Sequence, residues 1–382
     1  MPATMIVDLL EQCAEQLDAR IEPRLHAIIE SASRDRENPM PLYELATLCR
    51  RHGQTNLWRA AIDSAFGLPH DSYQQIYYRG RAKLLLGDWS GWRDLESRIY
   101  DPGAGYLASR PVRVLRFNVR AWDGRESIGD KSLYVIADGG FGDCLQMSRY
   151  IPTLADRVGR LVLCVRPELA SLMRQAYGDR LTLTLRTVED TKTYDRYAWM
   201  MSWPALIGDP PPFALLPGVK RNPRPAPAER RADIGICWAG DPDWADDAAR
   251  SLSLQLMAPL LGREDVRWFS LQTGPAGAIT DDARITPPAS PLYSFSQTAA
   301  LIARLDAVIT VDTAVAHLAG ALGVPTWLLL PADADPRWGI GPTTPWYPSV
   351  RLVRQRAVGE WTDVLATVEA ELETWAWQTT TV

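Results

Sequence analysis

The feature that most constrains the fold is a strand, a polar corner, a short helix and a second strand in direct succession. Residues 307–311 (AVITV) and 325–330 (PTWLLL) are continuously apolar, a pattern typical of parallel strands covered on both faces. Between them, Thr313 is suited to cap a helix over 314–322, and Gly323 is suited to end it. The segment therefore predicts an α/β fold with a parallel sheet.

The corner of this segment is a candidate binding site. Asp312 and Thr313 follow the first strand directly, and in open α/β sheets ligands bind at this edge, where the N–H groups of a helix N-terminus favour an anion. His317 lies one turn beyond Thr313, so a hydroxyl, amides and an imidazole can converge on one phosphate. The alternative is that Asp312 and Thr313 only cap the helix and that His317 is a core histidine.

Composition excludes several classes of protein. The 382 residues are enough for two or three domains, and a net charge of −5, from 41 basic and 46 acidic residues, provides no global field for nucleic acid or an anionic membrane. The five cysteines form no CxxC pair, which predicts reduced core residues. Because no signal-type core and no run of about 20 apolar residues occurs, we expect a soluble cytoplasmic protein without a membrane span.

The N-terminal region has helical periodicity and few strand signals. Apolar residues recur at steps of three and four, and the best helical segments are 5–26, 42–51, 57–66, 73–86 and 89–100. The segments 57–66 and 73–86 indicate a helical hairpin, and 89–100 indicates another helix after it. Such hairpins stack into solenoids, although no clean 34-residue repeat is present.

Strands and helices then alternate in two sets. The first set has candidate strands at 133–137, 161–165, 181–185 and 197–201, with helical segments at 145–158 and 168–177. Residues 209–231 are rich in proline and lack periodicity, which indicates a linker. The second set has candidate strands at 234–238, 268–271, 308–311, 327–330 and 350–353, before a terminal amphipathic helix at 360–375.

These patterns predict four parts of the chain. A helical region covers 1–105, and two Rossmann-like domains cover 106–215 and 216–358. A C-terminal helix, 359–382, is expected to pack back on the N-terminal half.

The first α/β set opens with a glycine-rich turn after its first strand. Gly139, Gly140 and Gly142 permit a sharp turn and a close approach to a ligand, and Asp143 begins the next helix. Asp143 is either a functional carboxylate or only the N-cap carboxylate of that helix. The turn does not match the dinucleotide-binding pattern G-x-G-x-x-G, because Leu145 occupies the position of the third glycine.

The second set has its own polar loops at the ends of strands. Arg250 and Ser251 end the loop after 234–238, where a guanidinium can bind a diphosphate or pair with a nearby aspartate, Asp246 or Asp247. Gln272 follows another strand and either hydrogen-bonds a base or ribose or braces the loop.

Two acidic D-x-D triplets, 241–243 and 333–335, provide weak evidence for a metal site. No P-loop, HExxH, GxSxG or paired CxxC motif occurs in the sequence, which argues against the commonest kinases, zinc proteases and serine hydrolases. We expect no metal and no resident cofactor.

A series of motifs runs in fixed order from about Gly87 to Leu372: GDWSGWRDLESR, DGGFGDCLQMSRY, ICWAGDP, RSLSL, WFSLQ, LDAVITVDTAVAHLAGALGVPTWLLLP and PWYPSVRLVRQ. In this order they resemble a bacterial family of tetratricopeptide-linked glycosyltransferases of the GT-B fold. That family is related to glycosyltransferase family 9, which includes the heptosyltransferases, and more distantly to protein O-GlcNAc transferases.

The resemblance implies a GT-B fold of two Rossmann-like domains after an α-helical tetratricopeptide-like region. It implies an inverting, metal-independent transfer from a nucleotide sugar, held mainly by the C-terminal half, to an acceptor hydroxyl on a protein or a cell-surface glycan. Asp143 matches the proposed general base. Asp312, Thr313, Ala314 and His317 match the site of the donor diphosphate and sugar. The helices then offer a surface for a protein acceptor or for assembly into a homo-oligomer.

The sequence departs from the family at two places. Relatives have glutamate and glutamine where Asp138 and Gly139 stand, and Asp-Trp-Arg-Trp where residues 335–338 read DPRW. Arg250 also lacks the second basic residue that such loops often carry. The alternative function is therefore a noncatalytic helical-repeat scaffold or binding protein with a degenerate GT-B unit.

Overall fold

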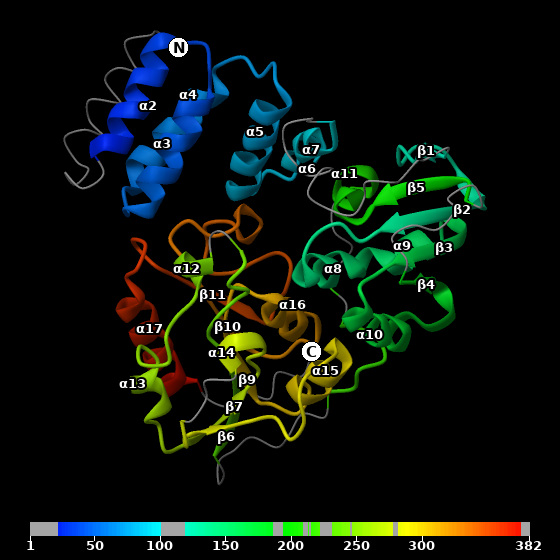
Figure 1. Cartoon of the computed structure of the whole chain (residues 1–382), viewed down its shortest axis with the longest axis vertical. Helices are drawn as coiled ribbons and strands as arrows, with labels where there is room; N and C mark the ends of the chain where they lie inside the picture. The colour runs from blue at the N-terminus through cyan, green and yellow to red at the C-terminus, as the bar shows by residue number, and fades with distance from the viewer. Residues whose placement is uncertain are drawn as a thin grey trace. The chain divides into compact units, whose positions relative to one another are not determined.

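The computed structural model describes residues 22–100, 119–185, 194–208, 213, 215–221, 231–244, 247–277 and 282–375. The chain forms two compact units. The first unit contains the N-terminal helices together with residues 331–340 and 354–360. The second contains both sheets, and each unit is described separately below (Figure 1).

The first unit is built from amphipathic helices around one apolar core. Leu42, Leu45, Cys49, Ala61 and Ala65 are fully or almost fully buried in it. The helices are α2 (Glu22–Arg34), α3 (Met40–Arg51), α4 (Thr55–Phe66), α5 (Tyr73–Leu85), α6 (Gly91–Leu95) and α7 (Ser97–Tyr100).

The predicted helices over 42–51, 57–66 and 73–86 are confirmed within a few residues. Most of the helix expected over 5–26 lies outside the described residues. The expected helix over 89–100 is divided at Glu96 into α6 and α7. Ser72 begins α5 through a capping box with Gln75, which fixes where the helix starts.

The segment 331–340 is bound to these helices by ion pairs. Arg50 pairs with Asp333 at 2.9 Å and also donates to the carbonyl oxygen of Ala332. Asp335 caps the short helix η6 (Pro336–Trp338) and pairs with Arg337. Burial alone would raise the pKa of Asp335, but the charge and hydrogen bonds of Arg337 hold that pKa well below its usual value. Both carboxylates of this D-x-D triplet are thus engaged by arginines.

The first sheet of the second unit has strand order β1-β5-β2-β3-β4, with parallel neighbours. Its apolar strands confirm the four strands expected from the sequence, and β1 is an additional short strand. The strands are β1 (Arg120–Ala121), β2 (Ile128–Ile136), β3 (Val158–Cys164), β4 (Thr182–Thr184) and β5 (Arg196–Trp199). The helices are α8 (Phe141–Met147), η2 (Ser148–Tyr150), α9 (Ile151–Ala155), α10 (Pro167–Tyr177), η3 (Gly178–Arg180), η5 (Met200–Ser202) and α11 (Trp203–Ile207).

The single helix expected over 145–158 is instead three short helices, α8, η2 and α9. Pro152 lies in the first turn of α9, where its missing N–H is tolerated, whereas inside one continuous helix it would remove a hydrogen bond. Val158 already belongs to β3.

The second sheet has strand order β11-β10-β9-β6-β7-β8. Every residue of its central strands β6, β9 and β10 is buried, as their apolar sequences predict. The strands are β6 (Ala232–Cys237), β7 (Val266–Ser270), β8 (Ile285–Thr286), β9 (Ala307–Val311), β10 (Thr326–Leu330) and β11 (Val350–Arg354). The helices are α12 (Asp247–Arg250), α13 (Ala258–Leu261), α14 (Gly274–Gly277), α15 (Phe295–Ile302), α16 (Ala314–Ala321) and α17 (Trp361–Thr374).

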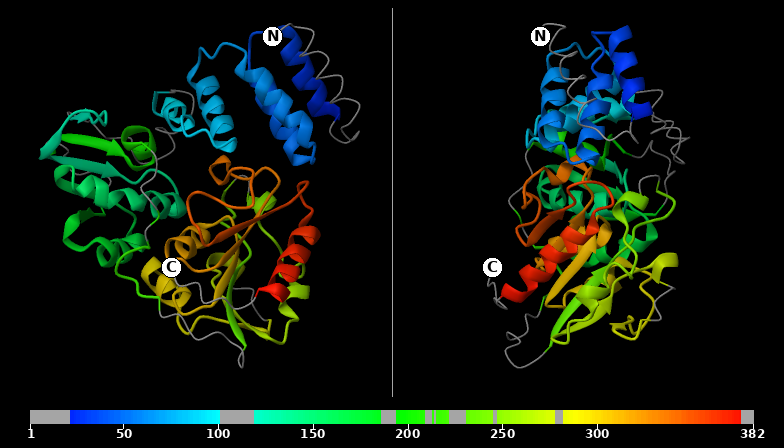
Figure 2. Two further views of the ribbon diagram at one scale, coloured as in Figure 1. Left: turned by 180° about the vertical axis from the view of Figure 1, so that it is seen from behind. Right: turned by 90° about the vertical axis from the view of Figure 1, so that its left-hand side faces the viewer.

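The C-terminal helix α17 packs on this second sheet (Figures 1 and 2). Its buried residues, among them Val364 and Val368, belong to the core that contains Trp327 of β10. Glu371 accepts a hydrogen bond from the Trp327 indole N–H at 2.8 Å. The helix was expected over the correct residues, but its apolar face covers the second sheet instead of the N-terminal half.

Among the helices of the described residues, none combines the length and apolar character that a membrane crossing requires. The described part of the expected linker, residues 213 and 215–221, contains no helix or strand. Leu216 donates its amide to the carbonyl oxygen of Ala321 at the end of α16, so this segment lies against the second sheet's helix layer.

One half-buried histidine, His70, makes the stability of the helical unit depend on pH. His70 contacts the hydroxyl of Tyr43 through Nε2 at 2.7 Å and the carbonyl oxygen of Leu68 through Nδ1 at 2.9 Å. Burial, and then the charges of Arg79 and Lys83, lower its pKa below the ordinary 6.5, although Leu68 and Asp94 act in the opposite direction.

We expect the free energy of unfolding of this unit to decrease as the pH falls through 6.5 toward the lower folded pKa, because only the unfolded chain then binds the proton on His70. Urea unfolding of the whole chain, followed by circular dichroism from pH 7.5 to 5.5, measures this dependence. His70→Asn should flatten it, and His26→Asn, at an exposed histidine, should not. Equal slopes in all three proteins would contradict the assignment.

Candidate functional site

The second sheet contains a topological switch point between β6 and β9. From β6 the chain continues to β7 and β8 on one side, and from β9 it continues to β10 and β11 on the other. The loops that leave the carboxyl ends of β6 and β9 therefore diverge and leave space between them, which is where α/β sheets bind ligands. The loop after β6 contains Gly240, and the loop after β9 is Asp312–Thr313.

The N-terminus of α16 is built as the sequence predicts. Thr313 is the N-cap, and its hydroxyl accepts from the amide of Val315 at 3.3 Å. Helix α16 ends at Ala321, and Gly323 follows with φ of 65°, a conformation that favours glycine. The Thr313 hydroxyl also lies 3.3 Å from that of Thr310.

The thiol of Cys237 lies beneath this corner, 3.7 Å from the Thr313 hydroxyl. Burial raises the pKa of Cys237, so it is a thiol at neutral pH. It is one of four described cysteines, all reduced and buried.

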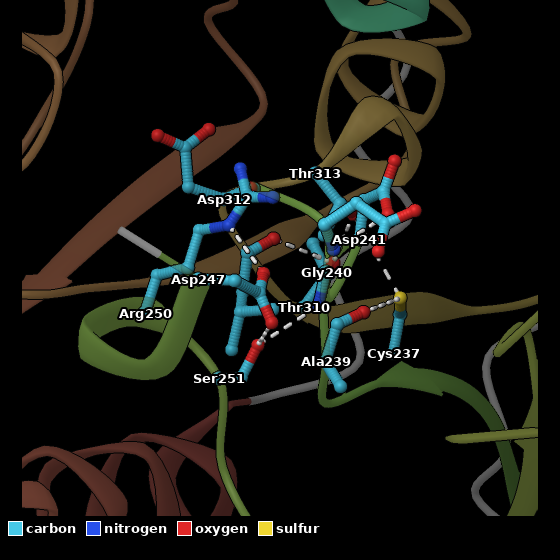
Figure 3. Close-up of polar contacts among 12 residues, drawn as sticks. Cys237, Ala239, Gly240, Asp241, Asp247, Arg250, Ser251, Thr310, Asp312 and Thr313 are labelled. Carbon is cyan, nitrogen blue, oxygen red and sulfur yellow. Dashed lines mark hydrogen bonds and ion pairs between the residues drawn. The ribbon is translucent and has the colours of Figure 1, made fainter. Parts of the chain in front are cut away.

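Arg250 joins the two loops of the switch point. Its Nε donates to Asp247 at 2.9 Å, and its Nη1 donates to the carbonyl oxygen of Asp312 at 3.0 Å (Figure 3). The pairing with Asp247 is one of the two alternatives open from the sequence, and Asp246 lies outside the described residues. The guanidinium nevertheless reaches the residue that precedes the N-cap of α16, with its side chain 22% exposed.

Ser251 and Gln272 brace the loop after β6. The Ser251 hydroxyl accepts from the amide of Gly240 at 2.9 Å and donates to Asp247 at 2.8 Å. The Gln272 carbonyl oxygen accepts from the amides of Trp238 and Ala239, and its Nε2 donates back to the carbonyl oxygen of Ala239. The bracing alternative for Gln272 is therefore present in the structure.

The glycine-rich turn lies at the switch point of the first sheet, where β2 and β5 diverge. Asp138 is 2% exposed and accepts from the amide of Met201 at 2.9 Å, which ties the end of β2 to the segment after β5. Asp143 lies in the first turn of α8 and accepts from the amide of Gly140 at 2.6 Å. Asp143 is therefore not the N-cap that one alternative expected, because Gly140 is the N-cap; the carboxylate instead caps α8 from the third helical position.

Gly139 is required by this capping geometry. Its φ is 134°, and a Cβ at this position would lie 2.6 Å from the Asp143 carboxylate. A glutamine, expected here in relatives, would therefore displace the carboxylate.

The two motifs that the sequence places far apart meet at Gly142. A Cβ on Gly142 would lie 2.6 Å from His317 Cδ2 and 3.5 Å from Ala314 Cα. Since only a glycine permits this approach, the N-terminal turn of α8 packs directly against that of α16. The structure thus brings Gly142, Ala314 and His317 together, and Arg250 reaches the same corner through Asp312.

Tyr347, which was not predicted as a site residue, places its hydroxyl 3.1 Å from His317 Nδ1. Its sequence signal is only the PWYP motif of the resemblance, and no spacing rule connects Tyr347 to a helix 30 residues earlier. His317 itself is buried, with 5% of its surface exposed.

Within the described parts of the chain, His, Cys, Asp and Glu side chains do not gather in groups of three or more that could hold a metal ion. In the triplet 241–243, Asp241 accepts from the backbone amide of Asp243 at 3.1 Å. That contact is an ordinary turn of the Asx type.

Comparisons with known proteins agree with the motifs. Residues 289–360 match glycosyltransferase family 9 (heptosyltransferase). Protein FlbA of Caulobacter vibrioides is 26% identical over 348 residues, which cover 81% of this chain and 56% of that protein. The chain thus spans little more than half the length of this relative.

Two solved structures show lower similarity. E. coli ADP-heptose lipopolysaccharide heptosyltransferase II aligns with a TM-score of 0.42 and 15% identity, over 64% of this chain and 99% of that one. Thermobaculum terrenum O-GlcNAc transferase aligns with a TM-score of 0.32 and 14% identity, over 98% and 93% of the two chains. The segment that matches this family, residues 289–360, contains β9, α16 and β10.

Proposed function

We propose that this chain is a glycosyltransferase that moves a sugar from a nucleotide sugar to an acceptor hydroxyl. One observation carries the proposal: the segment that matches glycosyltransferase family 9 contains Asp312, Thr313, Ala314 and His317, and these residues lie at the switch point of a parallel sheet. Switch points are the usual ligand sites of such sheets.

In this proposal the donor diphosphate binds at the N-terminus of α16. The dipole and amides of that helix favour an anion, and Arg250 adds a positive charge that already reaches the carbonyl oxygen of Asp312. Gln272 and Ser251 hold the β6 loop in place, and we assign them an indirect role in donor binding. No metal ion is needed in this scheme, because amides, a hydroxyl and a guanidinium balance the phosphate charge.

The transfer itself is proposed to be inverting. A base removes the proton from the acceptor hydroxyl, its oxygen forms a bond to the anomeric carbon, and the bond from that carbon to the diphosphate breaks. The nucleoside diphosphate leaves with the bonding electron pair, stabilised by α16 and Arg250. Asp143 is the candidate base, because it lies beside Gly142, which contacts the α16 turn.

The acceptor and the cellular location also belong to the proposal. A protein or a cell-surface glycan is the expected acceptor, reached from the first sheet. The N-terminal helices would bind a protein acceptor or a second copy of the chain. The buried, reduced state of the four described cysteines supports a cytoplasmic location.

The first prediction concerns metal dependence. The melting temperature is measured with ADP, GDP or UDP, each added separately in the presence of EDTA. We expect at least one of the three nucleotides to raise it. A ligand at 100 times its Kd stabilises a protein by about 2.7 kcal/mol. Stabilisation that requires Mg²⁺ or Mn²⁺ and is abolished by the chelator would contradict the metal-independent scheme.

The second prediction concerns the donor site. Arg250→Ala and Thr313→Val should each weaken nucleotide binding by roughly 1 to 3 kcal/mol, since each removes a buried or charged hydrogen bond. Calorimetric titration measures the loss. Arg284→Ala is the matched control, because Arg284 is also paired with an aspartate. Arg284 directly precedes the edge strand β8, away from the loops that follow β6 and β9.

Thr313→Ser keeps the capping hydroxyl and should bind like the parent. If Arg250→Ala and Thr313→Val also retain the parental affinity, the donor binds elsewhere.

The third prediction separates the enzyme from the noncatalytic alternative. Asp143→Asn keeps an oxygen that can accept from the Gly140 amide, but it removes the proton acceptor. If Asp143 is the base, sugar transfer should fall by about 10² to 10⁴ while the melting temperature and donor affinity remain unchanged. Asp156→Asn, at a largely exposed aspartate, is the control.

If Asp143 only caps α8, Asp143→Asn should be silent and Asp143→Ala should cost about 1 kcal/mol of stability. The scaffold alternative is favoured by one observation, the use of the Asp143 carboxylate in the cap. Nucleotide binding without any transfer to the acceptors tested, by parent and variants alike, would support that alternative.

A further inference from the structure

The imidazole of His317 is held in one orientation by groups from both ends of its ring. His317 and Gly320 lie three residues apart on α16 and therefore share a face of the helix. The ring of Tyr347 lies against Gly320: a Cβ there would be 2.5 Å from Tyr347 Cγ. This close packing places the Tyr347 hydroxyl 3.1 Å from His317 Nδ1.

The opposite edge of the imidazole faces the first sheet's helix α8. A Cβ on Gly142 would lie 3.2 Å from His317 Nε2 and 2.6 Å from Cδ2. Two glycines, Gly142 and Gly320, thus remove the side chains that would otherwise push His317 or Tyr347 away.

Tyr347 is itself fixed by its surroundings. It is 1% exposed, and the Arg149 guanidinium lies 5.2 Å from the centre of its ring. Arg149 also lies over the ring of Trp346 and donates to the carbonyl oxygen of that residue. Phe213 packs edge-on against Tyr347 at 6.4 Å between ring centres. The phenol therefore cannot turn away from His317 without repacking Arg149, which is partly buried.

The position of Arg149 decides which group donates the hydrogen bond. A cation over a phenol ring withdraws electron density and makes the hydroxyl a stronger donor. When the Tyr347 hydroxyl donates, Nδ1 of His317 is the acceptor and the ring proton is on Nε2.

We propose that the Tyr347 hydroxyl donates to Nδ1 of His317 and that Tyr347 is thereby a positioning residue, which fixes the tautomer and orientation of the imidazole at the junction of α8 and α16. The tautomer follows from this donated hydrogen bond. Its consequence for ligand affinity rests on the proposed function.

The test uses the full chain labelled with ¹⁵N-histidine. The sequence has four histidines, so the ring signals can be assigned with His317→Gln. In the parent protein His317 should show a bare Nδ1 and a protonated Nε2. A parent protein with a protonated Nδ1 would overturn the proposal without any further variant.

Tyr347→Phe keeps the ring on Gly320 and removes only the hydroxyl. We expect a mixture of His317 tautomers and a nucleoside diphosphate affinity lower by about tenfold, the size expected for the loss of one well-oriented hydrogen bond. Tyr150→Phe is the matched control, since it removes a fully buried hydroxyl that bonds to Gly208. The control should change neither quantity.

The remaining outcomes are also decisive. If Tyr347→Phe retains the parental tautomer and affinity, the positioning role is wrong. If the tautomer changes in Tyr347→Phe but ADP, GDP and UDP bind neither protein, the positioning role stands and the proposed donor site fails. If the control changes the tautomer as much as Tyr347→Phe does, the effect is general loosening and the proposal is overturned.

Discussion

The packing of α8 against α16 at Gly142 is the contact on which the rest of the candidate site depends. The contact requires a residue without a side chain, because His317 and Ala314 occupy the space where a Cβ would be. The N-terminal turn of each helix begins at the switch point of its own sheet. The contact therefore joins the two loops that carry the chemistry-bearing residues. Without it, the motif around Asp143 and the motif around Thr313 would belong to separate sheets with no common site.

Most polar side chains of the site are hydrogen-bonded within the protein before any ligand binds. Arg250 is held by Asp247 and by the carbonyl oxygen of Asp312, and Gln272 is held by two backbone amides. Such bonds fix donors in place, so that little reorganisation is needed when an anion arrives. The same bonds also explain why these residues cannot be assigned from the sequence alone. A brace and a ligand require the same residue types at the same end of a strand.

The sequence predicts those elements whose signals are local. The strands β9 and β10 are continuous apolar runs, and Thr313 and Gly323 mark the ends of α16 by their own backbone preferences. Features that depend on distant residues were not predicted. The apolar face of α17 fits either sheet in principle, and Trp327 and Glu371 select the second one. Tyr347 was missed because its partner, His317, is 30 residues away and is reached only through the shape of α16 at Gly320.

The domain boundaries illustrate the same limit. The sequence pattern predicts a domain boundary near residue 105. In the structure, residues 331–340, which follow β10, also belong to the compact unit of the N-terminal helices. The cause is electrostatic: Arg50 pairs with Asp333, and the side chains of both are less than a quarter exposed. Removing one partner from a partly buried pair leaves the other charge poorly solvated, which costs more than the pair contributes. The N-terminal helices and residues 331–340 thus form one compact unit although they are far apart in the sequence.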